Sequence, residues 1–331
     1  MIKSTNSSHV GQKLLAHIEM SRPYTVIWCG LVSLTGASLL YQNIPPLSTA
    51  VLVTFIPMMG WIAGLYLSDY LDQNLDKIQK PHRPIPSGRI TPWEALGIGG
   101  LVAISGFLLS FLLGLLNVLL VIPVAILVFL YGRYAKSRGI LGNLIRGLVI
   151  MLAYFYGIVA INHTLTDIPL SLWLFSLVFL LHDTNSNLIG AIRDRQGDKE
   201  GGYHTIPVKY GIPVSLGISI TLSALYTSLL IISIFAYNIL RYPERFIILY
   251  ILSLIILSFM FIYLIRLRTH LNHQNALRAH EFMIAERITL ASALLLGIST
   301  TITLALGIFA VAISLSLFAQ YTLRKKYEFR E

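Results

Sequence analysis

The sequence has little charge and only one cysteine. Charged residues make up 12% of the 331 positions, whereas a soluble globular domain contains about 25%. Hydrophobic residues make up 55% of the chain, and the mean hydropathy is +0.72. So few charges do not cover a water-facing surface, which excludes an ordinary soluble domain. The single cysteine, Cys29, excludes an internal disulfide and a cysteine-rich metal or redox site.

Several sequence motifs are also missing. A His-Glu-x-x-His pair is absent, as is a Gly-x-x-x-x-Gly-Lys-Ser/Thr loop, so a zinc protease and an ATP-driven pump are not indicated. The net charge of +10 does not indicate a nucleic-acid partner, because the basic residues lie in loops between apolar runs, where membrane topology accounts for them. The first 22 residues are polar and do not resemble a cleaved signal peptide.

Long apolar runs dominate the remainder of the chain. Those at 98–130 and 214–240 exceed the roughly 20 residues that cross a bilayer, and they lack a polar face. Uniformly apolar segments favour helices over the alternating strands of a membrane barrel. We predict an all-α, polytopic integral membrane helix bundle of about nine spans, the last long enough to be two short helices. The expected spans are 23–41, 47–67, 93–113, 115–132, 142–162, 169–190, 212–239, 245–266 and 284–318.

The distribution of basic residues predicts the orientation in the membrane. Lysine and arginine gather in the N-terminal segment and in every second loop, whereas the loops around Asn43, Asn117 and Thr166 carry none. The N-terminus and the Asp-rich loops are therefore expected to be cytoplasmic. Arg241 and Arg245 break this pattern, and the basic cluster at 324–326 conflicts with nine spans. We divide the chain into a cytoplasmic segment 1–22, one transmembrane domain 23–320 and a tail 321–331.

Two long charged loops, 68–92 and 193–211, carry similar carboxylate motifs. Each has an Asp-x-x-x-Asp-Lys sequence followed by a histidine and a proline. At a spacing of four residues, the side chains of one motif share a helical face. The first motif contains Ser68, Asp69, Asp72 and Asp76, and the second contains Asn187, Asp194 and Asp198.

Like charges four residues apart on a helix repel, and at a membrane boundary desolvation raises the cost. A divalent cation removes this repulsion. Mg²⁺ prefers oxygen ligands and usually combines one or two carboxylates with water and substrate phosphates. Two such motifs on one side of the membrane therefore predict a Mg²⁺–diphosphate site.

Basic and polar residues beside the motifs fit an anionic ligand. Arg146 lies inside a predicted span, where an ionisable residue indicates a functional site. The loop cations are weaker indicators, because membrane orientation already requires them. The candidate substrate-binding residues are Ser68, Asp69, Lys80, Arg83, Tyr131, Lys136, Asn143, Arg146, Asn187, Arg195 and Lys199.

These motifs resemble the UbiA superfamily of intramembrane prenyltransferases. The first signature is Asp69-Tyr70-x-Asp72-x-x-x-Asp76 with Lys80-Pro81-His82-Arg83-Pro84-Ile85-Pro86-Ser87-Gly88-Arg89. The second is Arg193-Asp194-Arg195-Gln196-Gly197-Asp198-Lys199 with Thr205-Ile206-Pro207-Val208. Residues 131–136 with Asn143, and the Arg22-Pro23 pair, are also similar to family segments. The likeness covers the first six spans and the start of the seventh.

The resemblance implies nine helices around a central cavity that opens to lipid beneath a cytoplasmic cap. By motif position, Asp72, Asp76, Asp194 and Asp198 would be the catalytic metal carboxylates, and Asn187 a further Mg²⁺ ligand. The family's first motif usually opens with asparagine, whereas this chain has Ser68. A hydroxyl can still form a hydrogen bond or ligate weakly.

The expected function is Mg²⁺-dependent transfer of a prenyl group from an isoprenyl diphosphate to a lipophilic acceptor. The acceptor is left open between an aromatic compound and one that bears a phosphate or carboxylate. The same site would suit a terpene cyclase of the UbiA type, which uses no acceptor. An anion transporter explains the buried arginine but not the paired carboxylates. Candidate aromatic groups for stabilising a carbocation are Tyr66, Tyr70, Tyr131, Tyr154 and Tyr156.

Overall fold

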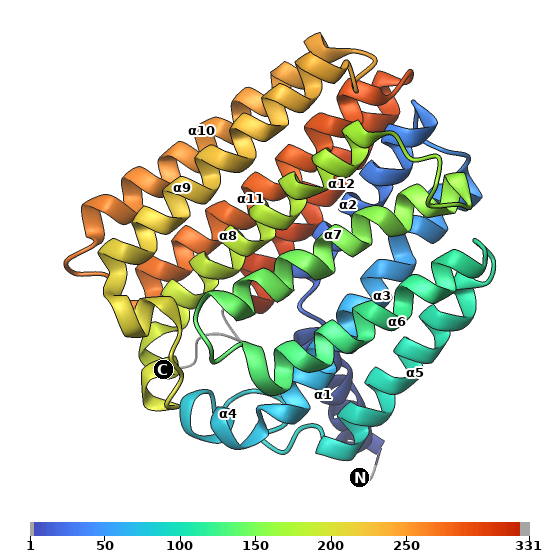
Figure 1. Cartoon of the computed structure of the whole chain (residues 1–331). Helices are drawn as coiled ribbons and strands as arrows, with labels where there is room; N and C mark the ends of the chain where they lie inside the picture. Colours follow the sequence, from blue (N-terminus) through green and yellow to red (C-terminus); the bar gives the residue numbers. More distant parts are fainter. Residues whose placement is uncertain (1–2, 325–331) are drawn as a thin grey trace.

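The computed structural model describes residues 3–324, and every element within them is helical (Figure 1). The predicted all-α bundle is confirmed. The elements are α1 (Lys3–Ser21), α2 (Pro23–Tyr41), α3 (Leu47–Leu71), α4 (Gln73–Gln79), α5 (Pro92–Ser110), α6 (Leu115–Leu130), η1 (Tyr131–Ala135), α7 (Ile140–Asn162), α8 (Leu170–Glu200), α9 (Ile206–Tyr237), α10 (Pro243–Leu267), α11 (His273–Ile298), α12 (Ile302–Ala319) and η2 (Gln320–Arg324).

Most of the long helices suit a bilayer. Among the described residues, eight helices are long and apolar enough to cross a membrane by themselves. The helices α8 and α11 are also long enough to cross a membrane, with 31 and 26 residues, but they carry charged side chains. The charged residues in the middle of these helices, Asp183 on α8 and Glu286 and Arg287 on α11, are buried in the bundle, whereas the exposed ones, such as Arg195 and Arg278, lie toward one end of each helix. The chain is therefore a multi-pass integral membrane protein.

The predicted last span, 284–318, is divided between two helices. The helix α11 begins before this span, at His273, where the Asn272 side chain accepts a hydrogen bond from the Asn275 N–H at 2.8 Å. It ends at Ile298, and Ser299 takes an extended conformation before α12 begins. Hydropathy alone does not find this start, because the first turns of α11 are polar. The return of α12 brings Arg324 to the end of the bundle where Tyr24 begins α2.

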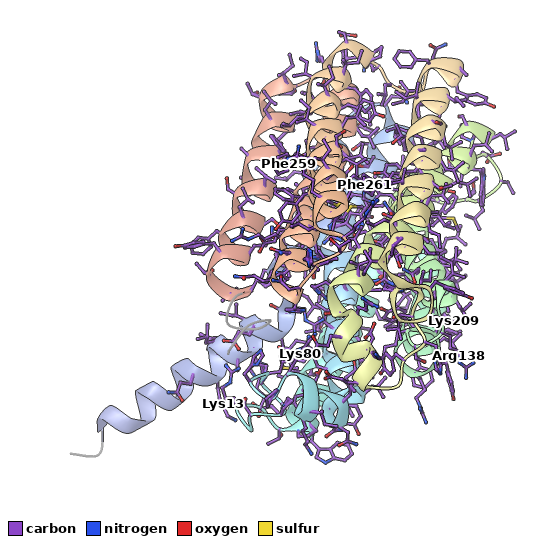
Figure 2. All side chains as sticks on the ribbon, turned by 90° about the vertical axis from the view of Figure 1, so that its left-hand side faces the viewer. Lys13, Lys80, Arg138, Lys209, Phe259 and Phe261 are labelled. Atoms are coloured by element: carbon purple, nitrogen blue, oxygen red, sulfur yellow. The ribbon has the colours of Figure 1, made fainter. Side chains whose placement is uncertain are left out.

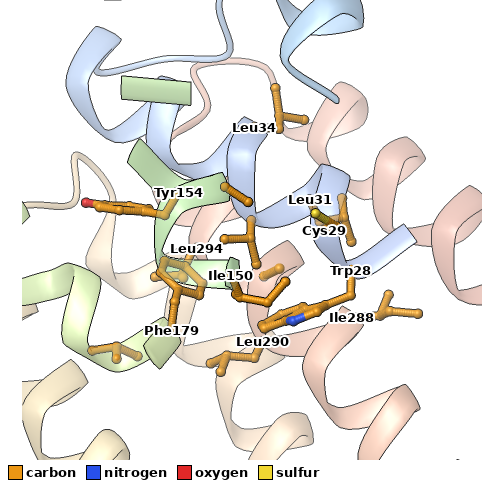
Figure 3. Packing of buried hydrophobic residues seen from close by; sticks show 14 of the residues in the cluster. Trp28, Cys29, Leu31, Leu34, Ile150, Tyr154, Phe179, Ile288, Leu290 and Leu294 are labelled. Carbon is orange, nitrogen blue, oxygen red and sulfur yellow. The ribbon is translucent and has the colours of Figure 1, made fainter. Parts of the chain in front are cut away.

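The hydrophobic core lies between α2, α7, α8 and α11. Trp28, Ile150, Phe179 and Leu290, one from each helix, are buried in a single cluster (Figure 3). By contrast, α5, α6, α10 and α12 expose rows of large apolar side chains. Such outward apolar rows are what lipid-facing helices present. Polar residues therefore have room only in the interior and at the ends of the bundle.

One end of the bundle is strongly basic. Lys13, Lys80, Arg138 and Lys209 lie at the lower end of the view in Figure 2, while Phe259 and Phe261 lie higher in the bundle. The helix α1 projects from this end, and the backbone turns at Arg22, where φ is 41°. The basic end also carries both predicted carboxylate motifs, because α3 and α8 continue beyond their apolar spans there.

Backbone contacts close this end. In η1 the Lys136 N–H donates to the Tyr131 carbonyl at 3.1 Å, the wider spacing of a π-helix, which is frequent at functional sites. The segment after η1 then meets the loop after α8, because the His204 N–H donates to the Ser137 carbonyl at 2.9 Å. Two segments separated by over sixty residues therefore form one cap over the interior.

Candidate active site

A cavity of about 580 Å³ runs from the cap into the bundle. Its deeper part is apolar and lies between α3, α5, α6 and α7, where Leu96, Phe107, Val121 and Val128 line it. Small residues on α3 and α5, such as Gly60, leave this part wide. Its outer part is polar and contains carboxylates from α3, α4 and α8. The polar outer part of the cavity is therefore continuous with its apolar deeper part.

The first carboxylate motif lies at the junction of α3 and α4. Asp72 forms an ion pair with Lys136, which follows η1, and its other oxygen accepts a hydrogen bond from the Ser68 hydroxyl at 3.3 Å. Asp76 is buried and is held by Arg83, whose Nη1 lies 2.8 Å and 3.0 Å from the two carboxylate oxygens. Asp72 and Asp76 therefore each lie against a cationic side chain.

The second motif lies on the last turns of α8 and faces the first. Lys80, from the first loop, reaches Asp194 at 3.5 Å, and Arg193 donates to the same carboxylate through Nε at 3.0 Å and through Nη2 at 2.5 Å. Asp198 accepts a hydrogen bond from the Thr205 hydroxyl at 3.2 Å. The Tyr131 hydroxyl donates to Oδ1 of the Asn187 side chain at 3.4 Å. The Lys80–Asp194 pair therefore links two loops that are far apart in the sequence.

Asp198 lies beyond the apolar span of α8 but is largely enclosed. Burial, and then repulsion from Asp194, raise the pKa of Asp198 to about 7, although the Thr205 hydroxyl, Lys80 and Arg193 act in the opposite direction. Asp194 and Asp198, one helical turn apart on α8, therefore repel each other when both are ionised. A bound cation would relieve this repulsion.

The donor set fits a Mg²⁺ ion that shares its ligands with a substrate. Within residues 3–324, no group of three His, Cys, Asp or Glu side chains is close enough to hold a metal by itself. Mg²⁺ bound with a phosphate substrate needs only one or two carboxylates, since water and phosphate oxygens complete the octahedron. Asp72 and Asp76 on one side, and Asp194 and Asp198 on the other, all line the polar part of the cavity.

Arg146 marks the boundary between the polar and apolar parts. Its guanidinium lies 4.1 Å from the centre of the Trp61 ring and 5.6 Å from that of Tyr131. Behind it, the buried Asp183 lies 3.7 Å from Nε and also accepts a hydrogen bond from the Trp28 indole at 3.1 Å. Aromatic faces and one carboxylate thus hold this cation inside the bundle.

The predicted site residues gather at the cavity, with three exceptions. Asp69 is buried outside the lining, where it pairs with Arg22 and lies 3.8 Å from Arg83. Arg195 and Lys199 lie on the exposed face of α8. The residues that line the cavity are Ser68, Asp72, Asp76, Lys80, Arg83, Tyr131, Lys136, Asn143, Arg146, Asn187, Asp194 and Asp198.

Asn143 has a bridging position. In the orientation of its side-chain amide that gives both polar atoms a partner, the nitrogen donates to the Gly139 carbonyl at 3.0 Å and the oxygen accepts from the Leu188 N–H at 2.8 Å. It therefore fixes the start of α7 against α8.

Of the five candidate tyrosines, Tyr131 and Tyr156 line the cavity.

Several lining residues are absent from the sequence-based set. They include Arg22, Arg193, Tyr203, Thr205 and His280. Arg193 and Thr205 lie within the second motif, so their position beside Asp194 and Asp198 was a usable signal. His280 had no such signal, because α11 carries no motif and reaches the cavity only through tertiary packing.

Comparison with known proteins identifies the family. The family model for the UbiA prenyltransferase family matches residues 26–285. A digeranylgeranylglyceryl phosphate synthase from Pyrococcus horikoshii is 32% identical over 59% of this chain and 69% of its own length.

Two solved structures share the fold. A UbiA homologue from Aeropyrum pernix superposes with a TM-score of 0.69 at 19% identity, covering 81% of this chain and 96% of the homologue. A UbiA homologue from Archaeoglobus fulgidus, bound to DMAPP and Mg²⁺, gives a TM-score of 0.56 at 16% identity, covering 93% and 99%. The family match extends over most of the helices that build the cavity. This chain therefore belongs to the UbiA prenyltransferase family and is a membrane-embedded prenyltransferase.

Proposed function

We propose that this enzyme transfers a prenyl group from an isoprenyl diphosphate, with Mg²⁺, to a lipophilic acceptor that carries a phosphate. The observation that carries the proposal is the single cavity with a charged outer part and an apolar inner part. A prenyl diphosphate has the same division, a charged head and a hydrocarbon tail. The head would lie between the two carboxylate motifs and the tail between α3, α5 and α6.

The cations around the motifs suit a departing diphosphate. Breaking the bond between the prenyl C1 and the diphosphate oxygen leaves both electrons on oxygen, and Lys80, Lys136 and Arg193 are placed to offset that charge. Mg²⁺, held by Asp72, Asp76, Asp194 and Asp198, would supply further charge neutralisation as a Lewis acid. The apolar walls keep water from the allylic cation, and the faces of Tyr131 and Tyr156 can stabilise it. The acceptor hydroxyl oxygen then forms the bond to C1, and its proton passes to the released diphosphate.

A phosphate on the acceptor would explain Arg146. Its ion pair with Asp183 is long, 3.7 Å, so its remaining N–H groups can turn toward the cavity that it lines. The relative from Pyrococcus horikoshii is named for a glyceryl phosphate product. A prenylglyceryl phosphate is therefore the acceptor we expect, with its phosphate near Arg146 and its lipid chain in the apolar channel.

We also propose that the Asp-rich end faces the cytoplasm. The basic residues of the bundle concentrate there, and positively charged loops remain on the cytoplasmic side during insertion. With α11 and α12 as separate helices, Arg324 lies at this same end, which removes the conflict that nine spans created.

One assay tests these assignments together. Purified protein in detergent would receive geranylgeranyl diphosphate with Mg²⁺ or EDTA, first alone and then with geranylgeranylglyceryl phosphate. Diphosphate release that needs both Mg²⁺ and the acceptor, with a diprenylated product by mass spectrometry, is expected. In sealed vesicles, added donor should react only when the cytoplasmic face is outward.

The other outcomes are equally clear. Release without acceptor, giving a hydrocarbon or terpene alcohol, would identify a cyclase. Transfer to an aromatic acid but not to the glyceryl phosphate would overturn the acceptor. Turnover unaffected by EDTA would remove Mg²⁺ from the proposal.

The residue at position 68 offers a further test. Ser68→Asn, which restores the residue usual in the family motif, is expected to lower the Mg²⁺ concentration for half-maximal turnover by about tenfold. The reason is that an amide oxygen is a better ligand for a hard cation than a weakly donating hydroxyl. A Mg²⁺ titration of initial rates measures this. Ser87→Asn, in the loop between α4 and α5 and outside the cavity lining, is the control. An unchanged titration for Ser68→Asn would place Ser68 outside the metal site.

A further inference from the structure

The C-terminal helices lie beyond the part of the chain that the family model matches. The match ends at residue 285, within α11, whereas α12 and η2 cover Ile302–Ala319 and Gln320–Arg324. The helix α12 packs against α11 and α2, and η2 continues from it toward the basic end of the bundle. Among the described residues of α12 and η2, Arg324 is the charged one that is buried, and its exposed fraction is 0%.

Among the described residues, Arg324 contacts three side chains. Its Nη2 lies 2.7 Å from Nδ1 of His280 on α11, and its Nη1 donates to the Gln320 side-chain oxygen at 3.1 Å. Its guanidinium lies 5.2 Å from the centre of the Tyr24 ring on α2. An arginine inside a membrane bundle is costly to bury, so its presence points to a function.

The contact with Arg324 determines the tautomer of His280. An arginine has only donors and does not lose its proton in proteins. His280 Nδ1 must therefore accept the hydrogen bond with its lone pair, which places the ring proton of the neutral imidazole on Nε2. The opposite edge of the ring consequently carries an N–H donor.

That edge of the ring faces the second carboxylate motif. Nε2 of His280 lies 3.6 Å from the point that a Cβ on Gly190 would occupy. On α8, Gly190 lies between Asn187 and Asp194, one turn from each, so it shares their helical face. His280, Gly190 and Tyr24 all line the cavity. The missing side chain at position 190 leaves space where a ligand atom can approach the imidazole.

We propose that His280 is a phosphate-binding residue and that Arg324 is its positioning residue. In this arrangement Arg324 locks the imidazole so that Nε2–H donates to a phosphate oxygen in the cavity beside Gly190. The inference rests on the proposed prenyl-transfer function. The phosphate oxygen can come from the diphosphate of the donor or from the acceptor headgroup, and the steady-state KM of each substrate distinguishes these two sources.

The test compares His280→Phe, His280→Gln and Arg324→Met. Phenylalanine removes both ring nitrogens, whereas the glutamine amide can place an N–H donor close to the position of Nε2. Loss of one hydrogen bond to a charged oxygen is expected to raise KM by about tenfold in His280→Phe and Arg324→Met. The KM of His280→Gln should stay close to the wild-type value. A rise confined to the acceptor assigns the phosphate to the acceptor, and a rise confined to the donor assigns it to the diphosphate.

The double variant His280→Gln/Arg324→Met decides whether Arg324 acts through His280. If it does, Arg324→Met adds nothing to KM once glutamine has replaced histidine. Arg324→Lys, which keeps a donor, should rescue part of the loss and serves if Arg324→Met does not fold. His270→Gln and Arg268→Gln, both exposed at the end of α10, are the matched controls.

Two results would overturn the proposal. One is an unchanged KM for both substrates in His280→Phe. The other is an effect of Arg324→Met that is equal in the His280→Gln background and in the wild type, which would assign Arg324 a purely structural role. Wild-type turnover in the same assay shows whether the underlying prenyl transfer itself occurs, so failure of the two proposals is distinguishable.

Discussion

Asp194→Asn is expected to lower kcat for prenyl transfer by about 10²- to 10³-fold while the protein still inserts and folds. Asparagine has nearly the same shape as aspartate but no charge. The wild-type carboxylate lies 3.5 Å from Lys80 and 3.0 Å from Arg193, at the point where the two loops meet. Its neutralisation would remove one of the proposed Mg²⁺ ligands and the negative charge that Lys80 and Arg193 face. Initial rates with saturating donor and acceptor measure the effect.

Asp167→Asn is the matched control for this variant. Asp167 is exposed in the loop between α7 and α8, at the opposite end of both helices from the cap. Its substitution should leave kcat unchanged. A thermal midpoint in detergent, measured for both variants, separates loss of chemistry from loss of folding. Wild-type kcat in Asp194→Asn at every Mg²⁺ concentration would remove Asp194 from the metal site.

The spacing of the carboxylates predicted which faces meet in the cavity. Asp72 and Asp76, like Asp194 and Asp198, are four residues apart, and a helix puts such pairs on one face. The structure continues α8 through both residues of the second pair, and all four line the cavity. Because this relation is local, the sequence alone was sufficient to group them.

The same helical geometry separates the basic residues. Relative to Asp194, Arg195 is one position away and Lys199 five, so on α8 both turn from the carboxylate face. Arg195 and Lys199 were predicted to bind substrate because they are close to Asp194 in the sequence, but the turn of the helix directs them away from the cavity. Lys80, by contrast, reaches Asp194 from a loop more than a hundred residues earlier, and such a pairing depends on how the helices pack.

The C-terminal third shows where hydropathy fails. The polar first turns of α11 hid its start. Because the interruption at 299–301 has only three residues, hydropathy left open whether 284–318 is one span or two helices, and the structure has two. The distribution of basic residues indicates the additional crossing. A basic cluster that conflicts with an odd number of spans fits a chain that crosses once more. Residues 325–331 of the predicted tail lie outside the described residues.

The crossing of α2 and α7 is the place where a small change should cost the most stability. A Cβ on Gly157 would lie 1.8 Å from the Ser33 carbonyl oxygen, and one on Gly36 would lie 2.2 Å from the Tyr154 carbonyl oxygen. Both obstacles are backbone atoms, which do not rotate away as a flexible side chain can. The two helices therefore approach each other backbone to backbone, as small residues permit in membranes.

Gly157→Ala is accordingly expected to lower the free energy of unfolding by about 3 kcal/mol, the upper part of the usual range for overpacking. Gly217→Ala is the control, because a Cβ there meets nothing within 4 Å and alanine favours a helix over glycine by about 1 kcal/mol. Thermal unfolding in detergent would measure both. A Gly157→Ala midpoint equal to that of the wild type would mean that α2 and α7 do not cross this closely. Because Thr25 on α2 and Arg146 on α7 line the cavity, their separation should also weaken substrate binding in any folded fraction.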